Sequence, residues 1–341
     1  MLSHHIGFLA KPLSRLLITL GVLIAGLPLT VAAAAAADVF HVALVLTGSI
    51  ADGGWNQQAY AGLKQLEGMS SFKVAYSENV KQSDIPQVVR GYADDGYELV
   101  IGHGFQFGSL FQEIGGDYPK QKFFATTYAP QGAIPSNVMY LDARYFDVGY
   151  CLGSLAALMS EKKGVGLVGG GDNPTQQNMM RVFKAGAEAT VPGIKAFAVV
   201  TGEYNDAAKG RETALTMIGN GADVITHTAD LTGIGAIKGA AEAKVHVIGA
   251  FSDQTDLAPD LMGTSFTNNN LGIVVKVAEM ANDGTFQGGK EWKPDLSFAW
   301  GLQYRGTDHN DKVIPAASWA KFMAIWNEVG AGKVDTKKFV Q

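Results

Sequence analysis

Residues 40–67 carry the sequence FHVALVLTGSIADGGWNQQAYAGLKQLE, in which an apolar run, a turn and an amphipathic stretch follow one another. The run Phe40–Leu46 is almost wholly apolar, as is typical of a parallel strand that is buried on both faces. From Trp55 to Glu67 the apolar residues recur three and four positions apart, which predicts a helix with one buried face. The segment therefore predicts a strand, a tight turn and a helix.

The same alternation continues along the chain. Further strands are expected at 72–76, 98–102, 122–127, 138–141, 165–168, 195–200, 223–227 and 245–249. Helices are expected between them, at 83–95, 109–116, 145–160, 176–189, 207–219 and 234–243. Such alternation predicts an α/β fold with parallel sheets and helices on both faces. The strands fall into two similar halves, which suits two lobes better than a single sheet.

Length and composition restrict the function classes. The chain has 341 residues, 47% of them hydrophobic, and a formal net charge of −5. It is therefore long enough for about two domains and too apolar to be disordered. Its mild acidity argues against nucleic-acid binding, which requires a basic face. The single cysteine, Cys151, excludes a disulfide framework and a zinc–thiolate cluster.

The first 37 residues predict a secretory signal peptide. Basic residues precede an apolar run at 16–31, and several A-x-A cleavage sites lead up to Ala37. The alternative is a membrane anchor, but the run is shorter than the roughly 20 residues that a spanning helix needs. We therefore expect cleavage near Ala37 and export to the periplasm. No cysteine near that site offers a lipid attachment point, and no later stretch predicts a membrane helix.

Two glycine-rich motifs are discarded on their context. Residues 164–169 match G-x-G-x-x-G, but they form a predicted strand instead of following one. Residues 284–290 resemble a phosphate-binding loop, but Glu291 stands where a magnesium-binding Ser or Thr is required. The sequence also lacks metal-ligand pairs of histidines and a G-x-S-x-G elbow. We therefore predict no cofactor, no metal and no catalytic activity, with Cys151 a buried structural thiol.

Three segments after predicted strands carry polar and aromatic groups together. They are residues 52–57 with Asp52 and Trp55, residues 202–210 with Tyr204 and Asp206, and residues 249–254 followed by 264–270. Taken singly, each Asp is explained as a helix N-cap, and Trp55 as packing against its own helix. Their recurrence in both halves predicts a cleft between two lobes that holds a planar, hydrogen-bonding solute.

Residues 45–62, VLTGSIADGGWNQQAYAG, resemble the opening motif of the basic membrane protein (Bmp) family. Its members are substrate-binding proteins of ABC importers, and purine-nucleoside receptors are the best known of them. The resemblance continues through 202–210, 221–225 and 247–254, and spans about residues 40–290. It implies a type I periplasmic-binding-protein fold, with two Rossmann-like lobes, a hinge and a ligand cleft between the lobes.

The resemblance also implies how the chain is divided. The N-terminal lobe is expected to contain residues 38–143 plus about 255–285. The C-terminal lobe is expected to contain 144–254 plus about 286–341. The implied partners are a small-molecule ligand and the permease and ATPase subunits of an importer, which would be the only link to a membrane. We expect a monomer that binds no nucleic acid.

Carried onto this chain, the family's motif implies a set of ligand-binding residues. Trp55 and Tyr204 would sandwich a base from opposite lobes. Asp52 and Asn56 would meet its polar edge or the cleft floor, and Asp206 would support the second loop.

The chain departs from the family pattern at three positions. Phe251 replaces the Asp that usually holds the ribose hydroxyls, Thr267 and Asn268 occupy the region of a usual Lys, and Tyr128 stands at a usual acidic position. Unpaired ribose hydroxyls buried against Phe251 would each cost roughly 1–3 kcal/mol. These departures predict a free purine such as adenine or guanine, or another flat heterocycle, in preference to a nucleoside, unless Asp253 reaches the sugar instead.

Other readings of the same cleft stay open. A nucleoside or sugar receptor of the same fold is the alternative within the binding class. A secreted hydrolase or isomerase is the alternative from another class.

Overall fold

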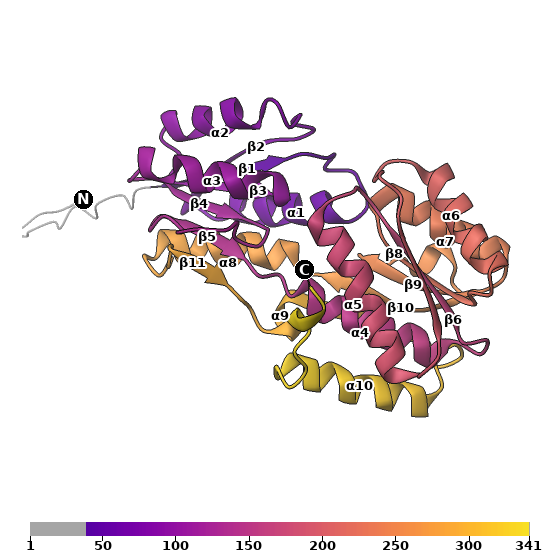
Figure 1. Cartoon of the computed structure of the whole chain (residues 1–341). Coiled ribbons are helices and arrows are strands. Elements are labelled where there is room, and N and C mark those ends of the chain that lie inside the picture. Colours follow the sequence, from indigo (N-terminus) through magenta and orange to yellow (C-terminus); the bar gives the residue numbers. More distant parts are fainter. Residues whose placement is uncertain (1–38, 341) are drawn as a thin grey trace, which may run out of the picture. The chain divides into compact units, whose positions relative to one another are not determined.

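The computed structural model describes residues 39–340, which form two six-stranded sheets with helices packed around them (Figure 1). The predicted signal peptide lies outside the described residues. The expected α/β class is confirmed, and the two-sheet arrangement is that of a type I periplasmic-binding-protein fold with two lobes.

The first sheet is wholly parallel and has the order β11-β5-β4-β3-β1-β2. Its strands, in chain order, are β1 (Phe40–Leu46), β2 (Phe72–Ser77), β3 (Leu99–His103), β4 (Lys122–Ala125), β5 (Val138–Leu141) and β11 (Lys290–Trp292). One face packs against α1 (Trp55–Glu67) and α8 (Asn270–Asn282), and the other against α2 (Ile85–Asp94) and α3 (Gly108–Ile114). Burial on both faces explains the continuous apolar run of β1.

The second sheet has the order β12-β10-β9-β8-β6-β7, with β12 antiparallel at its edge. Its strands are β6 (Gly164–Gly169), β7 (Lys195–Val200), β8 (Val224–Thr228), β9 (His246–Phe251), β10 (Met262–Asn268) and β12 (Trp300–Gln303). Helices α4 (Tyr145–Met159), α5 (Pro174–Thr190) and α10 (Ala316–Gly330) cover one face. Helices α6 (Ala207–Gly219) and α7 (Asp230–Glu242) cover the other.

Short elements complete the chain. They are the four-residue helix α9 (Leu296–Ala299) and the 3-10 turns η1 (Phe105–Phe107), η2 (Gly115–Asp117), η3 (Thr255–Leu257) and η4 (Lys337–Phe339). The G-x-G-x-x-G match at 164–169 is strand β6, as its sequence context predicted. Cys151 is fully buried within α4, a helix that is apolar around nearly its whole circumference.

The lobe boundaries differ from the expected ones after residue 255. Residues 255–285 were expected in the first lobe, but β10 pairs with β9 in the second sheet, and only α8 packs on the first. Residues 286–341 were expected in the second lobe, but β11 pairs with β5 in the first sheet. β11 has only three residues and β10 lies next to an edge strand. The sheet that each strand joins is therefore decided by tertiary pairing and not by its local sequence. The chain consequently crosses between the sheets three times, at 142–144, at 269 and at 293–295.

Candidate ligand-binding site

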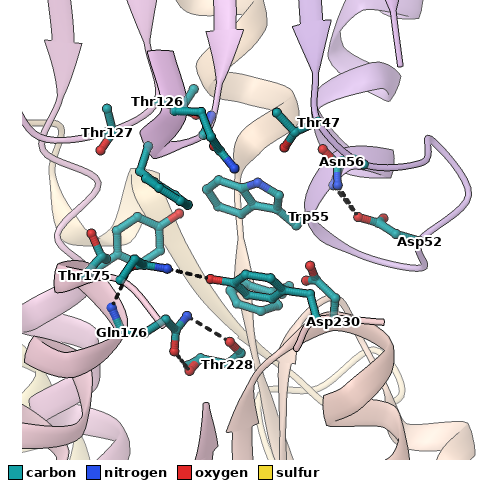
Figure 2. Close-up of a pocket in the computed structure, with 18 of the residues that line it drawn as sticks. Thr47, Asp52, Trp55, Asn56, Thr126, Thr127, Thr175, Gln176, Thr228 and Asp230 are labelled. Carbon is teal, nitrogen blue, oxygen red and sulfur yellow. Dashed lines mark hydrogen bonds between the residues drawn. The ribbon is translucent and has the colours of Figure 1, made fainter. Parts of the chain in front are cut away.

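A cavity of about 640 Å³ lies between the two sheets, at the carboxyl ends of their parallel strands (Figure 2). Such edges are where open α/β sheets bind ligands. Polar side chains on its wall include Thr47, Asp52, Asn56, Thr126, Thr127, Asn173, Thr175, Gln176, Thr228 and Asp230. Its aromatic side chains are Trp55, Phe105, Tyr128, Tyr145, Tyr204, Phe251, Phe266 and Trp300. The wall therefore combines ring surfaces with a limited set of hydrogen-bonding groups.

The loop before α1 is organised by the buried carboxylate of Asp52. Its Oδ1 accepts hydrogen bonds from the backbone N–H of Gly54 at 2.9 Å and of Gln57 at 3.1 Å. Its Oδ2 accepts from both the backbone N–H and the side-chain Nδ2 of Asn56, each at 2.8 Å. Asp52 thus satisfies the first amides of the helix, and its lone pairs are committed within the protein. Asn56 Oδ1, by contrast, is buried with no hydrogen-bond partner among the described residues.

The indole of Trp55 is supported from behind by a histidine. The ring stacks on His103 with centroids 4.3 Å apart and an interplanar angle of 21°. Burial lowers the pKa of His103 to about 4, so the imidazole is neutral near pH 7. Its two nitrogens contact the carbonyl of Trp55 at 3.1 Å and Thr126 Oγ1 at 3.0 Å. These contacts hold the indole in one orientation on the cavity wall.

Tyr204 lines the cavity from the loop between β7 and α6. Its ring lies against Gly170 and Gly171, where an added Cβ would come within 2.2 and 2.5 Å of ring atoms. Its hydroxyl accepts a hydrogen bond from Asn173 Nδ2 at 3.1 Å. The glycine pair and Asn173 therefore fix the position of the tyrosine ring. Burial raises the pKa of this phenol, which stays protonated.

Two further predicted residues border the cavity. Tyr128 stacks on Phe146 with centroids 4.9 Å apart and planes 7° from parallel. Phe251 ends β9 with a φ of 71°, and its ring meets Trp55 edge-on at 6.0 Å. The next residue, Ser252, donates a hydrogen bond to the carbonyl of Gly53 at 2.7 Å, which ties the second lobe to the Asp52 loop.

Three predicted residues lie away from this cavity. Asp206 is exposed and accepts a hydrogen bond from the backbone N–H of Lys209 at 2.9 Å as the N-cap of α6. Asp253 accepts from the hydroxyl of Thr255 at 2.6 Å and borders a smaller cavity of about 340 Å³. Asn268 borders that smaller cavity too, and neither polar atom of its amide has a hydrogen-bond partner in the described structure. The structure thus brings six of the nine predicted residues to the main cavity, and ligand binding by all nine stays a prediction.

Asp230, the first residue of α7, is a cavity residue that the sequence pattern did not predict. Its carboxylate lines the cavity, and no hydrogen bond reaches it from the residues that the structure describes (Figure 2). Burial, followed by the negative charge of Asp52, raises its pKa from 3.8 to about 7. This Asp follows a strand end, but nothing in the local sequence pattern distinguishes it from a helix cap.

Gln176 and Thr228 form a second missed group, from α5 and the end of β8. Thr228 Oγ1 donates to Gln176 Oε1 at 2.9 Å, and Gln176 Nε2 donates to the carbonyl of Thr228 at 3.0 Å. The pair joins two elements that are about 50 positions apart in sequence, so sequence spacing gives no sign of it. It forms a satisfied polar wall beside the rings.

Within residues 39–340 no cluster of His, Cys, Asp and Glu is arranged to hold a metal ion. None of the helices in that part of the chain is both long and apolar enough to cross a membrane. Burial raises the pKa of the Cys151 thiol well above its usual range, so it is not a nucleophile near neutral pH.

A two-lobed α/β chain with an aromatic cavity between its sheets has the architecture of a solute-binding protein. A solute-binding protein of an ABC transporter from Aeropyrum pernix K1 has the same fold, with a TM-score of 0.73 and 18% identity over 87% of this chain and 92% of that one. Another from Conexibacter woesei DSM 14684 has a TM-score of 0.69 and 22% identity, over 89% and 100% of the two chains.

The model of the Bmp family, described as ABC transporter substrate-binding proteins that are PnrA-like, matches residues 39–299. The chain belongs to this family. Basic membrane protein A of Borreliella afzelii is 28% identical to it over 279 residues, covering 80% of this chain and 84% of that protein. A purine-binding protein of Brucella abortus strain 2308 is 26% identical over 275 residues, covering 80% and 75%. The resemblance inferred from the motifs is confirmed.

Proposed function

We propose that this member of the Bmp family is an exported, periplasmic receptor that binds a purine-type nucleobase, or a related flat heterocycle, between its lobes. Family membership supports the role of an ABC substrate-binding protein. The purine-binding relative from Brucella abortus supports the ligand class. Export rests on the predicted signal peptide, residues 1–37.

The observation that carries the choice of a free base is the position of Phe251. Its ring lies on the cavity wall beside Trp55, where the family's usual Asp would hold ribose hydroxyls. A phenyl ring accepts no hydroxyl proton, and Asp253 is turned towards Thr255, beside the smaller cavity. A nucleoside with its sugar against Phe251 would therefore gain no acceptor for its hydroxyls from Phe251 or Asp253.

Binding would combine stacking with a few directed hydrogen bonds. Trp55 and Tyr204 present rings from different lobes, each held by its own support. Stacking of this kind contributes about 0.5–1.5 kcal/mol beyond the burial of apolar area. Closure of the lobes around the ligand would then signal a loaded receptor to the permease and ATPase subunits. The proposal requires no cofactor, no metal, no reaction and no oligomer.

The test has two parts. Mass spectrometry of small molecules released from freshly purified, denatured protein should identify a flat nitrogen heterocycle. Calorimetric titration of adenine, guanine, hypoxanthine and their nucleosides should then show each base binding about a hundredfold more tightly than its nucleoside, equivalent to nearly 3 kcal/mol. A nucleoside that binds more tightly than its own base would contradict the assignment.

A variant with a matched control tests whether Phe251 causes the preference for a base over its nucleoside. Phe251→Asp should shift the preference towards nucleosides, while Phe251→Asn, of similar size and uncharged, should shift it less. Both replacements tolerate the left-handed backbone at this position, because Asp and Asn adopt positive φ more readily than Phe. An unchanged ratio in Phe251→Asp would leave the base preference without this cause.

The alternatives give different results in the same experiments. A sugar receptor would release a sugar and ignore every purine. A secreted hydrolase or isomerase would form a product when incubated with a nucleoside, whereas a receptor leaves it intact.

A further inference from the structure

Asp230 has a left-handed backbone conformation, which is uncommon for any residue other than glycine. Its φ is 42°, in the left-handed region that glycine occupies freely and other residues only occasionally. It is the first residue of α7 and follows the end of β8, so its side chain starts at the edge of the sheet where the cavity lies. Glycine would be the locally more stable residue at this position. The carboxylate is therefore kept at some cost in local backbone energy.

The surroundings of Asp230 supply no compensation for its charge. The titratable groups that face it are Asp52 from the loop before α1, Tyr145 from α4 and Tyr204 from the loop before α6. None of these is a cation, and none donates a hydrogen bond to it in the described structure. Lys81 is the one basic residue among those that line the cavity. The carboxylate is therefore held in a desolvated place with its acceptor capacity unused.

A second acceptor that lines the cavity, from the first lobe, is also unused. Asn56 Nδ2 donates to Asp52, so the orientation of this amide is fixed and its Oδ1 faces away from that bond. That oxygen is buried without a partner among residues 39–340. Buried acceptors without donors are rare in folded proteins, so this oxygen is open to a donor from a molecule bound in the cavity.

We propose that Asp230 is a ligand-binding residue that accepts hydrogen bonds from adjacent N–H groups of the ligand, and that with Asn56 Oδ1 it selects heterocycles with a donor-rich edge. The inference rests on the proposed function and narrows it. Among purines, guanine has two neighbouring donors, the ring N1–H and the 2-amino group. Hypoxanthine has the same ring system without the amino group, and adenine pairs an amino group with a ring acceptor.

The ionised form of Asp230 is the one that accepts these hydrogen bonds from the ligand. A carboxylate accepts two parallel N–H bonds in a fork, whereas a protonated carboxyl donates one bond of its own. The pKa of Asp230 in the free protein is about 7. A ligand that donates N–H bonds therefore binds more tightly once Asp230 has lost its proton, at and above neutral pH. Guanine affinity should therefore rise as pH increases through 7. Adenine, whose edge suits a protonated carboxyl, should show the opposite trend.

The experiment titrates guanine, hypoxanthine and adenine into the mature protein at about pH 6 and pH 8. It compares the wild type with Asp230→Asn and Asp230→Gly. The wild type should prefer guanine over hypoxanthine by about tenfold or more, because each hydrogen bond to a charged group contributes roughly 1.5–3 kcal/mol. Both variants should lose most of that preference and the rise of guanine affinity with pH. Gly suits the left-handed backbone, so this variant folds even where Asn perturbs the turn.

Asp260→Asn is the matched control. It removes an exposed carboxylate from the loop before β10, outside the cavity, and should leave guanine affinity and its pH trend unchanged. If the wild type binds none of the purines, the proposed function fails and this inference fails with it. If the wild type binds guanine and both Asp230 variants keep its affinity, selectivity and pH trend, only the role of Asp230 is overturned.

Discussion

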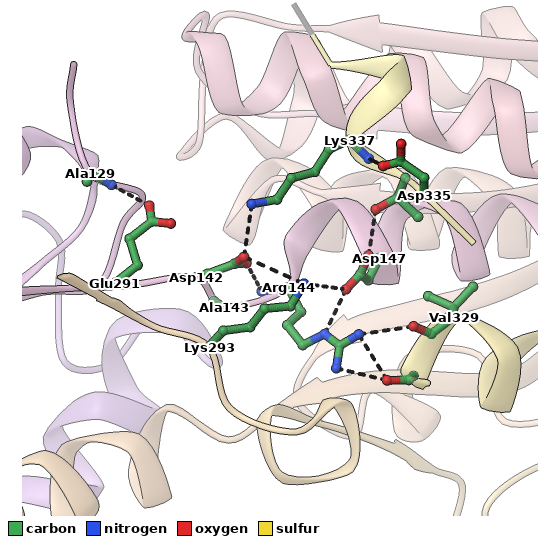
Figure 3. A network of polar contacts seen from close by, with 12 residues as sticks. Ala129, Asp142, Ala143, Arg144, Asp147, Glu291, Lys293, Val329, Asp335 and Lys337 are labelled. Atoms are coloured by element: carbon green, nitrogen blue, oxygen red, sulfur yellow. Dashed lines mark hydrogen bonds and ion pairs between the residues drawn. The ribbon is translucent and has the colours of Figure 1, made fainter. Parts of the chain in front are cut away.

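Two charged residues with positive φ occupy contrasting surroundings: Asp230 is half-buried at the cavity, and Arg144 is buried at the first crossover between the lobes. Asp230 and Arg144 both have left-handed φ angles, of 42° and 59°. Arg144 donates from Nε to Asp147 Oδ2 at 2.7 Å and from Nη2 to the carbonyl of Val329 at 3.0 Å (Figure 3). Its guanidinium is saturated with acceptors, whereas the carboxylate of Asp230 receives no donor from the described residues.

The network around Arg144 extends to both later parts of the chain. Asp142 lies 3.8 Å from Lys293, in the third crossover, and 3.4 Å from Lys337, near the C-terminal end. Asp147 accepts a hydrogen bond from the hydroxyl of Thr336 at 2.5 Å. A buried charge that is paired in this way holds the connection between the lobes together. The unpaired carboxylate of Asp230 has no such partner among residues 39–340, in keeping with the binding role proposed for it.

The largest effect is expected from breaking the paired charge. Arg144→Ala leaves Asp147 buried without its nearest cation and frees the carbonyls of Val329 and Gly330. Removing one member of a buried pair costs about 3–5 kcal/mol. Urea unfolding followed by circular dichroism should show that loss in the free energy of unfolding.

The control for this variant is an exposed arginine pair. Arg211 and Glu242 join α6 to α7 with both side chains about half exposed. Arg211→Ala should cost less than about 1 kcal/mol, as exposed pairs do. Equal losses in the two variants would show that burial of Arg144 has no special energetic weight.

Removing the unpaired charge of Asp230 should raise the free energy of unfolding, whereas removing Arg144 lowers it. Because the pKa of Asp230 is raised from 3.8 to about 7, the folded state binds more protons than the unfolded state between about pH 4 and pH 7. The free energy of unfolding of the wild type therefore falls as pH rises through that range. A pKa raised this far corresponds to at most about 4 kcal/mol, and solvent in the cavity reduces the expected effect to about 2 kcal/mol.

Asp230→Asn removes this penalty. The variant should be more stable than the wild type by about 2 kcal/mol at pH 8, and the difference should shrink towards pH 4. Chemical denaturation of the ligand-free proteins at several pH values measures it. A difference that does not change with pH would mean that Asp230 titrates normally in the folded protein.

Much of the fold was predictable because its signals are local. The apolar run of β1 and the helical spacing of α1 depend on neighbouring residues only, and the structure has both with the expected bounds. The sheet that contains β11 was not predictable from the same signals. Three residues carry no periodicity, and β11 joins the first sheet through pairing with β5, about 150 positions earlier.

The site was predictable where a residue type and a strand end coincide. Trp55 begins the helix after β1 and Tyr204 lies in the loop after β7, and both are too large to be explained as turn residues. Asp230 and His103 were missed because their roles depend on neighbours that are distant in sequence. Asp230 has no hydrogen-bond donor beside it in the described structure, and His103 stacks on the indole of Trp55. Asp206 was predicted on the same grounds as Asp52, but it caps α6 on an exposed surface.

A smaller effect is expected on ligand binding from the ring that covers the cavity wall. Trp55→Ala removes the stacking surface and exposes His103, so affinity for a purine base should fall at least tenfold, about 1.4 kcal/mol. Tyr204→Ala should have a similar effect from the other lobe. Calorimetry on both variants tests the sandwich, and unchanged affinity in both would contradict it. Trp319→Ala, on α10 and outside the set of residues that line the cavity, is the control for loss of an aromatic ring.

The smallest effect should come from the outer edge of the Arg144 network. Lys337 has a side chain 59% exposed and an ion pair of 3.4 Å with the buried Asp142. The ammonium group of Lys337 keeps most of its hydration. Lys337→Ala should therefore lower the free energy of unfolding by less than about 1 kcal/mol. Since Lys293 still faces Asp142 and Arg144 donates its backbone N–H to that carboxylate, the buried charge keeps partners in the variant. Urea unfolding at low and at about 1 M salt should show the small difference disappearing as the charges are screened. A loss as large as that of Arg144→Ala would show that the network depends on its exposed lysine as much as on its buried arginine.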